Sequence, residues 1–387
     1  MIEQIEPSLG RKLAFVSITI GAFLVLTAAL GEATLRWIAP KSDADKPGVK
    51  LEGSARLYGL KPNHRSRQTG VMVQTNSLGF RENEYPLQRR PGVRRIVVLG
   101  DSFTFGQGVE FQEIYSKRLE AQLNRSGDRY EVINFGIPGY NTTLELATWR
   151  EVAARFNPDL VILGYVLNDT EQVSLGKSGP TQPAGDSFLN SAHLWLRQVS
   201  MLYLFLAPRL GALILPSDPR YPVGGTRQIL ASFEYESAGW AESRDALLEL
   251  VGEARRAGTP VLVVVFPMMV DSYPLEPAHR KVTRFCREHG IEVLDLMSVV
   301  LEQKVSDMAV MLDDHPNGRA HKIFSERIYQ HLLHNYALLK NGVEAVARGR
   351  EAPRPLDHRD ERALRALGAG KPQGRGRRFG PPTKWLS

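Results

Sequence analysis

The residue best placed to do chemistry is Ser102, which follows a short apolar run. Residues 95–106 read RIVVLGDSFTFG, and the segment IVVL has the length and β-branched composition of a buried parallel strand that ends at a glycine. A serine at the carboxyl end of such a strand lies on the edge where open α/β sheets bind ligands. Its hydroxyl can act as a nucleophile if other parts of the chain supply a base and an oxyanion hole. On this stretch alone, the favoured interpretation is an ordinary turn in which Asp101 or Ser102 caps a helix.

Three further loops carry residue types that acyl transfer requires. The stretch NFGIPGYN contains glycines whose backbone N–H groups can approach a substrate oxygen closely. In the stretch LND, Asn168 can donate a side-chain N–H to an oxyanion. In the stretch DDHPN, His315 can deprotonate a serine, and the carboxylate two residues earlier can hold the imidazole. Taken singly, each loop is also consistent with a turn or a helix cap.

The elements that must position these loops are strands that alternate with helices. Apolar strands are predicted at 95–100, 130–135, 159–165, 260–267 and 291–295, and helices near 111–125, 142–155, 238–257, 276–289 and 318–339. This alternation predicts an α/β fold of three layers, α/β/α, with a five-stranded, parallel, flavodoxin-like sheet. The carboxyl ends of the strands would then face one crevice, and the four loops would meet there.

The four loops, in this order, resemble the conserved blocks of the GDSL or SGNH hydrolase family. GDSFTFG is similar to the first block, NFGIPG to the second, LND to the third and DDHPN to the last. The resemblance covers about residues 55–340 and is closest to bacterial members with an N-terminal membrane anchor. It implies a serine-dependent esterase with Ser102 as nucleophile and His315 as base. It also implies that Ser102, Gly139 and Asn168 form the oxyanion hole.

The acid that orients His315 is ambiguous in the sequence. Many members of the family place an aspartate three residues before the histidine, where this chain has Leu312. The shorter Asp-x-His form of the family places the acid at Asp313. Asp314 is the alternative.

Residues 13–30 are 18 uncharged, mostly apolar residues that predict a single transmembrane anchor. As a helix at about 1.5 Å per residue they span roughly 27 Å, the thickness of one hydrocarbon core. A cleaved signal peptide is the alternative, although this apolar stretch exceeds the usual ~7–15 residues. Arg11 and Lys12 favour a cytoplasmic N-terminus, but basic residues also follow the stretch, so charge alone leaves the orientation open. The family resemblance implies a domain outside the cytoplasm, tethered to the inner membrane.

The remaining segments define the expected domain organisation. We expect a cytoplasmic N-terminus at 1–12, the anchor at 13–30, a linker at 31–54, an SGNH-hydrolase-like domain at 55–340 and a basic, disordered tail at 341–387. The stretch TNSLGFR is predicted to form a turn that packs onto the domain. An insertion at 170–237 holds a second apolar stretch broken by arginines and a proline. It is predicted to be a helical cap over the crevice or a face on the bilayer, with ordinary core as the alternative.

Charge and composition exclude several classes of function. Six of the seven net positive charges fall in residues 341–387, so the folded part is nearly neutral and is not expected to bind nucleic acid. The single cysteine, Cys286, excludes an intramolecular disulfide and any multi-cysteine metal site, and a small buried side chain is expected there. No His/Asp cluster has ligand spacing and no phosphate-binding loop is present, so neither a metal nor a cofactor is expected.

The predicted function is hydrolysis of ester groups on envelope polysaccharide or lipid. One alternative is an O-acyltransferase that passes the acyl group to a polysaccharide by means of the same residues. A second alternative is a non-catalytic polysaccharide-binding or scaffold domain. The sequence leaves the acyl chain and the oligomeric state open.

Overall fold

A computed structural model of the 387-residue chain describes residues 9–39, 42–43, 47–126, 129–171, 195–196, 199–203, 205–206, 225–270, 273–310, 313 and 315–336. The chain divides into two compact units. One comprises Met1–Ala39 and Thr181–Ser217 with the terminal Ser387, and the other comprises Pro40–Pro180 and Asp218–Leu386.

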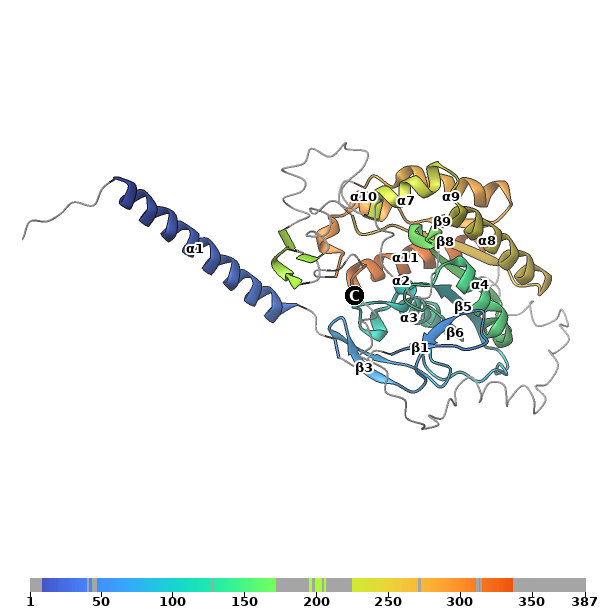
Figure 1. Cartoon of the computed structure of the whole chain (residues 1–387). Helices are drawn as coiled ribbons and strands as arrows, with labels where there is room; N and C mark the ends of the chain where they lie inside the picture. The colour runs from blue at the N-terminus through green and yellow to red at the C-terminus, as the bar shows by residue number, and fades with distance from the viewer. Residues whose placement is uncertain are drawn as a thin grey trace, which may run out of the picture. The chain divides into compact units, whose positions relative to one another are not determined.

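The second unit is built on a five-stranded parallel sheet (Figure 1). Its strands are β5 (Arg94–Gly100), β6 (Tyr130–Asn134), β7 (Leu160–Val166), β8 (Val261–Phe266) and β9 (Glu292–Asp295), in the order β6-β5-β7-β8-β9. The three inner strands are almost entirely buried because apolar, β-branched runs occupy them. Gly100 pairs with Gly164, and Val98 pairs with Asn134, so the carboxyl ends of β6, β5 and β7 lie side by side. The predicted flavodoxin-like sheet is confirmed.

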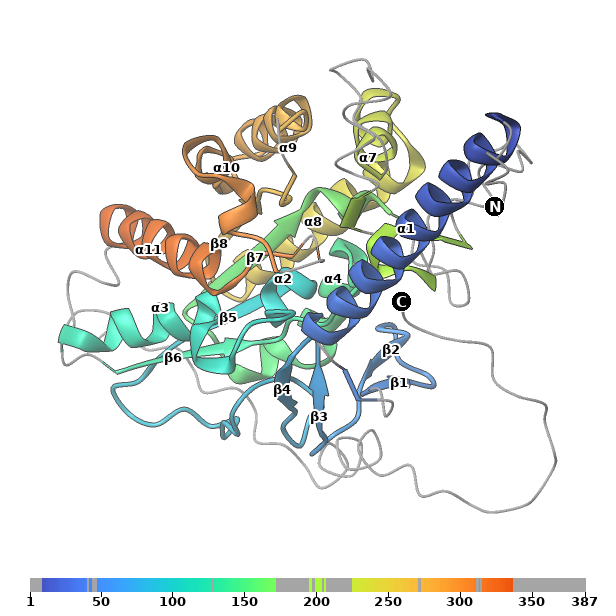
Figure 2. The same ribbon diagram turned by 90° about the vertical axis from the view of Figure 1, so that its left-hand side faces the viewer.

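Helices cover both faces of this sheet. On one face, α3 (Tyr115–Leu123) packs against α11 (Gly318–Asn335), and on the other α4 (Thr142–Glu151) packs against α8 (Ala238–Arg256), as Figure 2 shows. The helix α9 (Glu276–Glu288) lies next to α8, where Phe285 contacts Trp240 with ring centroids 5.7 Å apart. Side chains of Asn141, Ser237 and Asn317 cap α4, α8 and α11, as the turn residues in the sequence predict.

Shorter helices complete the second unit. They are α2 (Ser102–Phe105), α7 (Gly225–Glu234) and α10 (Ser298–Glu302), with 3₁₀ turns η1 (Phe111–Glu113), η2 (Asn124–Ser126), η3 (Ala153–Phe156), η4 (Leu167–Thr170) and η5 (Val305–Asp307). Cys286 is free and buried in α9, as expected.

Two small antiparallel hairpins precede the sheet. The strand β1 (Gly48–Lys50) pairs with β2 (Tyr58–Leu60), and β3 (Arg65–Gln68) pairs with β4 (Val71–Gln74). Ordered structure therefore begins inside the stretch 31–54, for which a linker is expected. After β4, the Asn76 side chain accepts hydrogen bonds from the N–H groups of Leu78 and Phe80, and this turn returns the chain to the sheet. We call residues 47–85 the lead-in.

The described end of the insertion belongs to the core. The helix α7 packs on η4 and α9, and its residues Ile229 and Phe233 are buried. A hydrogen bond of 2.8 Å joins Ser232 to Thr170. For this helix, the alternative of ordinary core agrees with the structure. Residues 172–194 and 207–224 of the insertion, and the tail at 341–387, lie outside the described residues.

The first unit contains α1 (Leu9–Ile38), which includes the apolar segment 13–30. Among the described residues it is the one helix long and apolar enough to cross a membrane. Near its end, Glu32 accepts hydrogen bonds from the N–H groups of Met201 and Leu202 at 3.0 and 2.9 Å. Part of the predicted insertion therefore lies against the end of α1.

Candidate active site

Ser102 is the first residue of α2, directly after the central strand β5. Asp101 precedes it as the helix N-cap, and its carboxylate accepts the Phe103 N–H at 2.8 Å. The cap fixes the turn that presents the Ser102 hydroxyl at the carboxyl edge of the sheet. Asp101 therefore caps the helix, as the first interpretation of this turn expected, and the Ser102 hydroxyl faces the imidazole of His315.

His315, the residue expected to act as base, lies beside Ser102. Nε2 of His315 lies 2.7 Å from Oγ of Ser102, although 213 residues separate the two along the chain. The loop that carries His315 is held by an isolated β-bridge between Ala309 and Pro316 and by the start of α11. The edge of the Phe103 ring packs against the imidazole, with centroids 5.6 Å apart. These contacts fix the imidazole at hydrogen-bond distance from the serine, which is the arrangement that general-base catalysis requires.

Asp313 lies on the other side of the imidazole. Its Oδ1 is hydrogen-bonded to Nδ1 of His315 and accepts the backbone N–H of the same residue at 3.1 Å. Burial alone would raise the pKa of Asp313, but the hydrogen bonds from His315 and Gln107 lower it below its usual value. The group is an ionised carboxylate that can stabilise an imidazolium. The alternative acid, Asp314, and Leu312 lie outside the described residues.

Gln107 is a site residue that the sequence did not indicate. Its Nε2 lies 3.1 Å from Oδ2 of Asp313, to which it donates, and 3.4 Å from Nδ1 of His315. It therefore holds the carboxylate oxygen that His315 leaves free. The signal in the sequence is its place five residues after Ser102, on the turn that ends α2, where the spacing brings it back toward the serine.

The two expected oxyanion donors follow the strands on either side of β5. Gly139 follows β6 and has a φ of +77°, a conformation that residues with a side chain rarely adopt. Asn168 lies in η4, directly after β7. Its buried Oδ1 has no hydrogen-bond partner in the part of the chain that the structure describes. This oxygen is thus not bound by the described residues, and the carboxamide can orient an N–H toward a substrate oxygen.

Three buried carboxyl groups lie beside these donors. Burial raises the pKa of Asp101 to about 6, although the hydrogen bond from the Phe103 N–H and the charge of His315 both act to lower it. Burial, together with the charge of Asp101, raises the pKa of Glu145 well above its usual value. Burial and the neighbouring Glu145 raise that of Asp169 in the same way. The environment of Glu145 and Asp169 therefore favours their neutral forms, which limits the negative charge that they place against a developing oxyanion.

Two histidines of α11 pack or pair within the domain. His321 is buried, stacks on Tyr115, and its Nδ1 accepts the Tyr115 N–H at 3.1 Å. His331 lies 2.8 Å from Glu292. Within the described ranges, no three or more His, Cys, Asp or Glu side chains are grouped so as to hold a metal ion.

Comparisons with known proteins agree with this geometry. The family described as "GDSL-like Lipase/Acylhydrolase family" matches residues 98–323, more than half of the chain. No curated protein sequence matches the chain.

Solved structures that are similar to the chain include those of TesA, EstA and Axe2. TesA is 17% identical with a TM-score of 0.39, and the likeness covers 62% of this chain and 98% of that chain. The psychrotrophic esterase EstA from Pseudoalteromonas sp. is 14% identical with a TM-score of 0.38, covering 64% and 100%. A catalytic mutant of the acetylxylan esterase Axe2 from Geobacillus stearothermophilus is 14% identical with a TM-score of 0.38, covering 62% and 94%.

Acyl transfer needs a serine hydroxyl, an imidazole and a carboxylate that are linked in this order by hydrogen bonds. They lie at the carboxyl edge of a doubly wound sheet, in loops that fall within the matched residues. The chain belongs to the GDSL-like lipase/acylhydrolase family and is an enzyme that hydrolyses ester bonds.

Proposed function

We propose that the chain is a serine esterase of the SGNH type in which Ser102, His315 and Asp313 form the catalytic triad. The observation that carries the proposal is the 2.7 Å contact between the Ser102 hydroxyl and Nε2 of His315, with Asp313 bound to the opposite ring nitrogen. This geometry fixes the imidazole tautomer that accepts a proton from the serine.

The reaction proceeds through an acyl-enzyme. Oγ of Ser102 attacks the ester carbonyl while Nε2 of His315 takes the hydroxyl proton, and the carbonyl oxygen becomes an oxyanion. The N–H groups of Ser102, Gly139 and Asn168 bind that oxyanion. The C–O bond to the alcohol then breaks, and His315 returns its proton to the leaving alkoxide. A water molecule repeats the sequence on the acyl-enzyme and releases the carboxylic acid.

A fluorophosphonate probe tests the triad directly. Such probes phosphonylate an activated serine, so we expect labelling of the wild type and none of Ser102→Ala. Ser298→Ala is the matched control, because Ser298 is an exposed serine at the start of α10 and its loss should leave labelling unchanged. A folded wild-type protein that is never labelled would exclude this mechanism.

We further propose that the substrate is an ester group on envelope polysaccharide or lipid and that residues 13–30 anchor the enzyme in the inner membrane. The length and apolar character of α1 support the anchor, and Arg11 with Lys12 favours a domain outside the cytoplasm. A C-terminal reporter that is active in only one compartment tests the orientation.

A turnover screen on acetylated polysaccharides and short acyl esters tests the substrate class. Release of free acid identifies hydrolysis. Acylated sugar formed only when an acceptor polysaccharide is added would instead identify transfer.

A further inference from the structure

The loop that carries Gly139 is attached to the lead-in at both of its ends. We call residues 134–141 the oxyanion loop. It follows β6, which is the edge strand of the sheet, so no further strand of the sheet supports it on that side. Its inner side is held to β5, where the N–H groups of Phe135 and Ile137 donate to the carbonyls of Val98 and Gly100 at 2.8 and 3.1 Å. Its outer side depends on side chains from outside the sheet.

Glu82 of the lead-in holds the first residue of the oxyanion loop. Its Oε2 accepts the backbone N–H of Asn134 at 2.8 Å. The Asn134 side chain continues the contact in two directions: it donates to the carbonyl of Thr104 in α2 at 2.6 Å and accepts the Gly136 N–H at 2.8 Å. Asn134 thereby links the oxyanion loop to the helix that begins with Ser102.

The fit between the oxyanion loop and α2 is close. A Cβ atom at Gly136 would lie 2.5 Å from the backbone nitrogen of Phe105. This distance is too short for a non-bonded contact, so the position accepts no residue with a side chain. The loop thus packs directly on the backbone of the nucleophile's helix. A small displacement of Asn134 would be transmitted to both elements.

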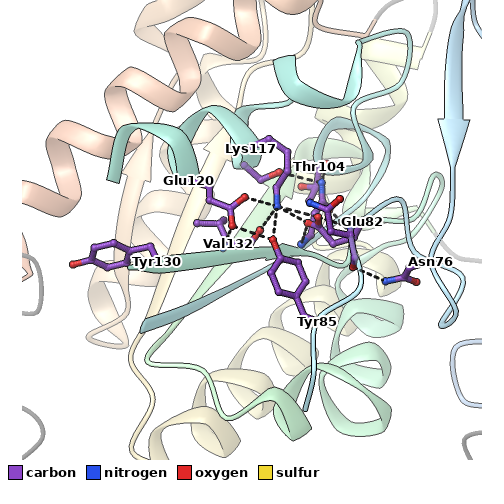
Figure 3. Close-up of polar contacts among 12 residues, drawn as sticks. Asn76, Glu82, Tyr85, Thr104, Lys117, Glu120, Tyr130 and Val132 are labelled. Atoms are coloured by element: carbon purple, nitrogen blue, oxygen red, sulfur yellow. Dashed lines mark hydrogen bonds and ion pairs between the residues drawn. The ribbon is translucent and has the colours of Figure 1, made fainter. Parts of the chain in front are cut away.

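Lys117 of α3 completes the polar cluster around Glu82. Figure 3 shows its ammonium group between the carboxylates of Glu82 and Glu120 and the carbonyl of Val132, with contacts of 2.9, 2.8 and 2.6 Å. Burial alone would lower the pKa of Lys117, but the two carboxylates raise it above its usual value, so the group is charged. Glu120 also accepts the Val132 N–H at 3.1 Å.

The cluster therefore occupies the place of a sixth strand along the outer edge of β6. Side chains of Glu120, Lys117 and Glu82 satisfy the N–H and C=O of Val132 and the N–H of Asn134. An edge strand normally exposes these groups. Here they are bound, and the last of them fixes the start of the oxyanion loop.

Tyr58 of β2 holds the other end of the oxyanion loop. Its hydroxyl donates to the carbonyl of Pro138 at 3.0 Å, and the hydroxyl of Tyr140 donates to the carbonyl of Tyr58. The two tyrosine rings meet edge to face with centroids 5.2 Å apart. Gly139 lies between the two anchored residues, so these contacts fix its N–H.

Arg81, next to Glu82, holds the end of α2. Its guanidinium is almost fully buried and donates to the carbonyls of Gly106 and Val109, each at 2.7 Å. Burial lowers the pKa of Arg81 to about 10, so it remains charged at neutral pH. Consecutive residues of the lead-in thus contact the nucleophile's helix and the oxyanion loop.

We infer that the lead-in is a positioning element of the catalytic site, in which Glu82 and Tyr58 set the distance between the Gly139 N–H and Ser102. The inference rests on the proposed role of Gly139 in the oxyanion hole. Neither residue contacts the triad, so both act through the oxyanion loop.

Two double variants isolate the contact from Glu82 to Asn134. Both variants lack the buried ion pair. In Glu82→Gln/Lys117→Met, the amide oxygen of the new glutamine still accepts the Asn134 N–H. In Glu82→Leu/Lys117→Met, the side chain at position 82 has no acceptor for that N–H. We expect kcat on p-nitrophenyl acetate to stay within about threefold of wild type in the first and to fall about tenfold or more in the second, because small misplacements of catalytic groups are costly. KM should change by less than about threefold in both, since oxyanion contacts act mainly in the transition state. Equal kcat values in two folded double variants would overturn the role of Glu82.

Tyr58→Phe keeps the ring packing and removes only the hydrogen bond to Pro138. We expect a fall in kcat of about three- to tenfold with an unchanged thermal midpoint. Glu131→Gln is the matched control, because Glu131 lies on β6, the strand that leads into the oxyanion loop, but forms its 2.6 Å ion pair with buried Arg95 of β5, away from the loop. It should lower stability and leave kcat unchanged. Wild-type kcat in Tyr58→Phe would overturn the role of Tyr58, and an unlabelled wild-type protein would instead overturn the proposed function.

Discussion

The molecule contains two triplets in which a histidine lies between a hydroxyl and a carboxylate. In the first triplet, His315 bridges Ser102 and Asp313. In the second, Nε2 of His279 lies 2.6 Å from the Tyr273 hydroxyl and Nδ1 lies 2.7 Å from Asp295. The order of the groups and their distances are nearly the same.

The surroundings of the two triplets differ. The His315 side chain is 24% exposed, whereas that of His279 is fully buried. The Tyr273 hydroxyl also accepts the Met268 N–H at 3.2 Å, and burial raises the pKa of the phenol, so it remains protonated. The second triplet joins the loop after β8 to α9 and β9. Hydrogen-bond order alone therefore does not make a catalytic site. The first triplet differs from the second in the exposure of its histidine and in the proposed oxyanion donors.

The largest expected difference is in activity when each hydroxyl is removed. Ser102→Ala should lower kcat on p-nitrophenyl acetate by at least about four orders of magnitude, because the nucleophile is lost. Tyr273→Phe should stay within about threefold of wild type. Comparable losses in both variants would show that the second triplet takes part in the reaction.

Substitution of Asn168 tests the proposed oxyanion hole, for which the second triplet has no counterpart in our proposal. Asn168→Ala should lower kcat by about 10² to 10³, the usual cost of one donor, without lowering the denaturation midpoint appreciably. The partly exposed carboxamide has a buried oxygen with no partner among the described residues, so little folding energy depends on it. A loss below about threefold would remove Asn168 from the oxyanion hole.

Loss of His279 should reduce the stability of the fold more than loss of His315. His279→Ala should lower the free energy of unfolding by about 2–4 kcal/mol, because it leaves a cavity and removes partners of Tyr273 and Asp295. His315→Ala should change it by no more than about 1 kcal/mol, since the site is open to solvent. Urea denaturation followed by fluorescence measures both, and equal losses would contradict the division between structural and catalytic triplets.

Substitution of Gln107 should have a smaller effect on activity, and it should affect only the first triplet. Gln107→Ala removes the second hydrogen bond to the ionised Asp313 and should lower kcat by about tenfold, the value of one charge-assisted hydrogen bond. Its reaction with a fluorophosphonate should slow in parallel. Unchanged kinetics would mean that the contacts of His315 suffice to hold Asp313.

Glu145, which lies near Asp101, should make stability depend on pH. Its raised pKa means that the folded state keeps a proton that the unfolded state loses above about pH 4.3. Ionisation with rising pH therefore destabilises the folded protein. Glu145→Gln does not titrate, so its free energy of unfolding relative to that of wild type should be higher at pH 8 than at pH 5, by on the order of 1 kcal/mol. Parallel pH curves for the two proteins would contradict the buried, neutral carboxyl.

The fold and the core of the site were predictable because local sequence determines them. Apolar, β-branched runs predict the five strands, and motifs at their carboxyl ends predict Ser102 and His315. The sequence favoured Asp313 as the acid and left Asp314 as the alternative, because the spacing of residues does not fix the direction that a loop gives a carboxylate. Tyr58, Glu82 and Lys117 were not predictable either, because their roles arise from contacts across 15 to 80 residues.

The side chains that bind the outer edge of β6 determine how much of the N-terminal part an active fragment must keep. The family match starts at residue 98, yet a chain cut there would lose Glu82 and leave the Lys117 ammonium buried with a single carboxylate. It would also free the Asn134 N–H on an open strand edge, which invites pairing with other chains. Truncations intended for expression should therefore retain the protein from residue 47 onward, and shorter ones should be insoluble as well as inactive.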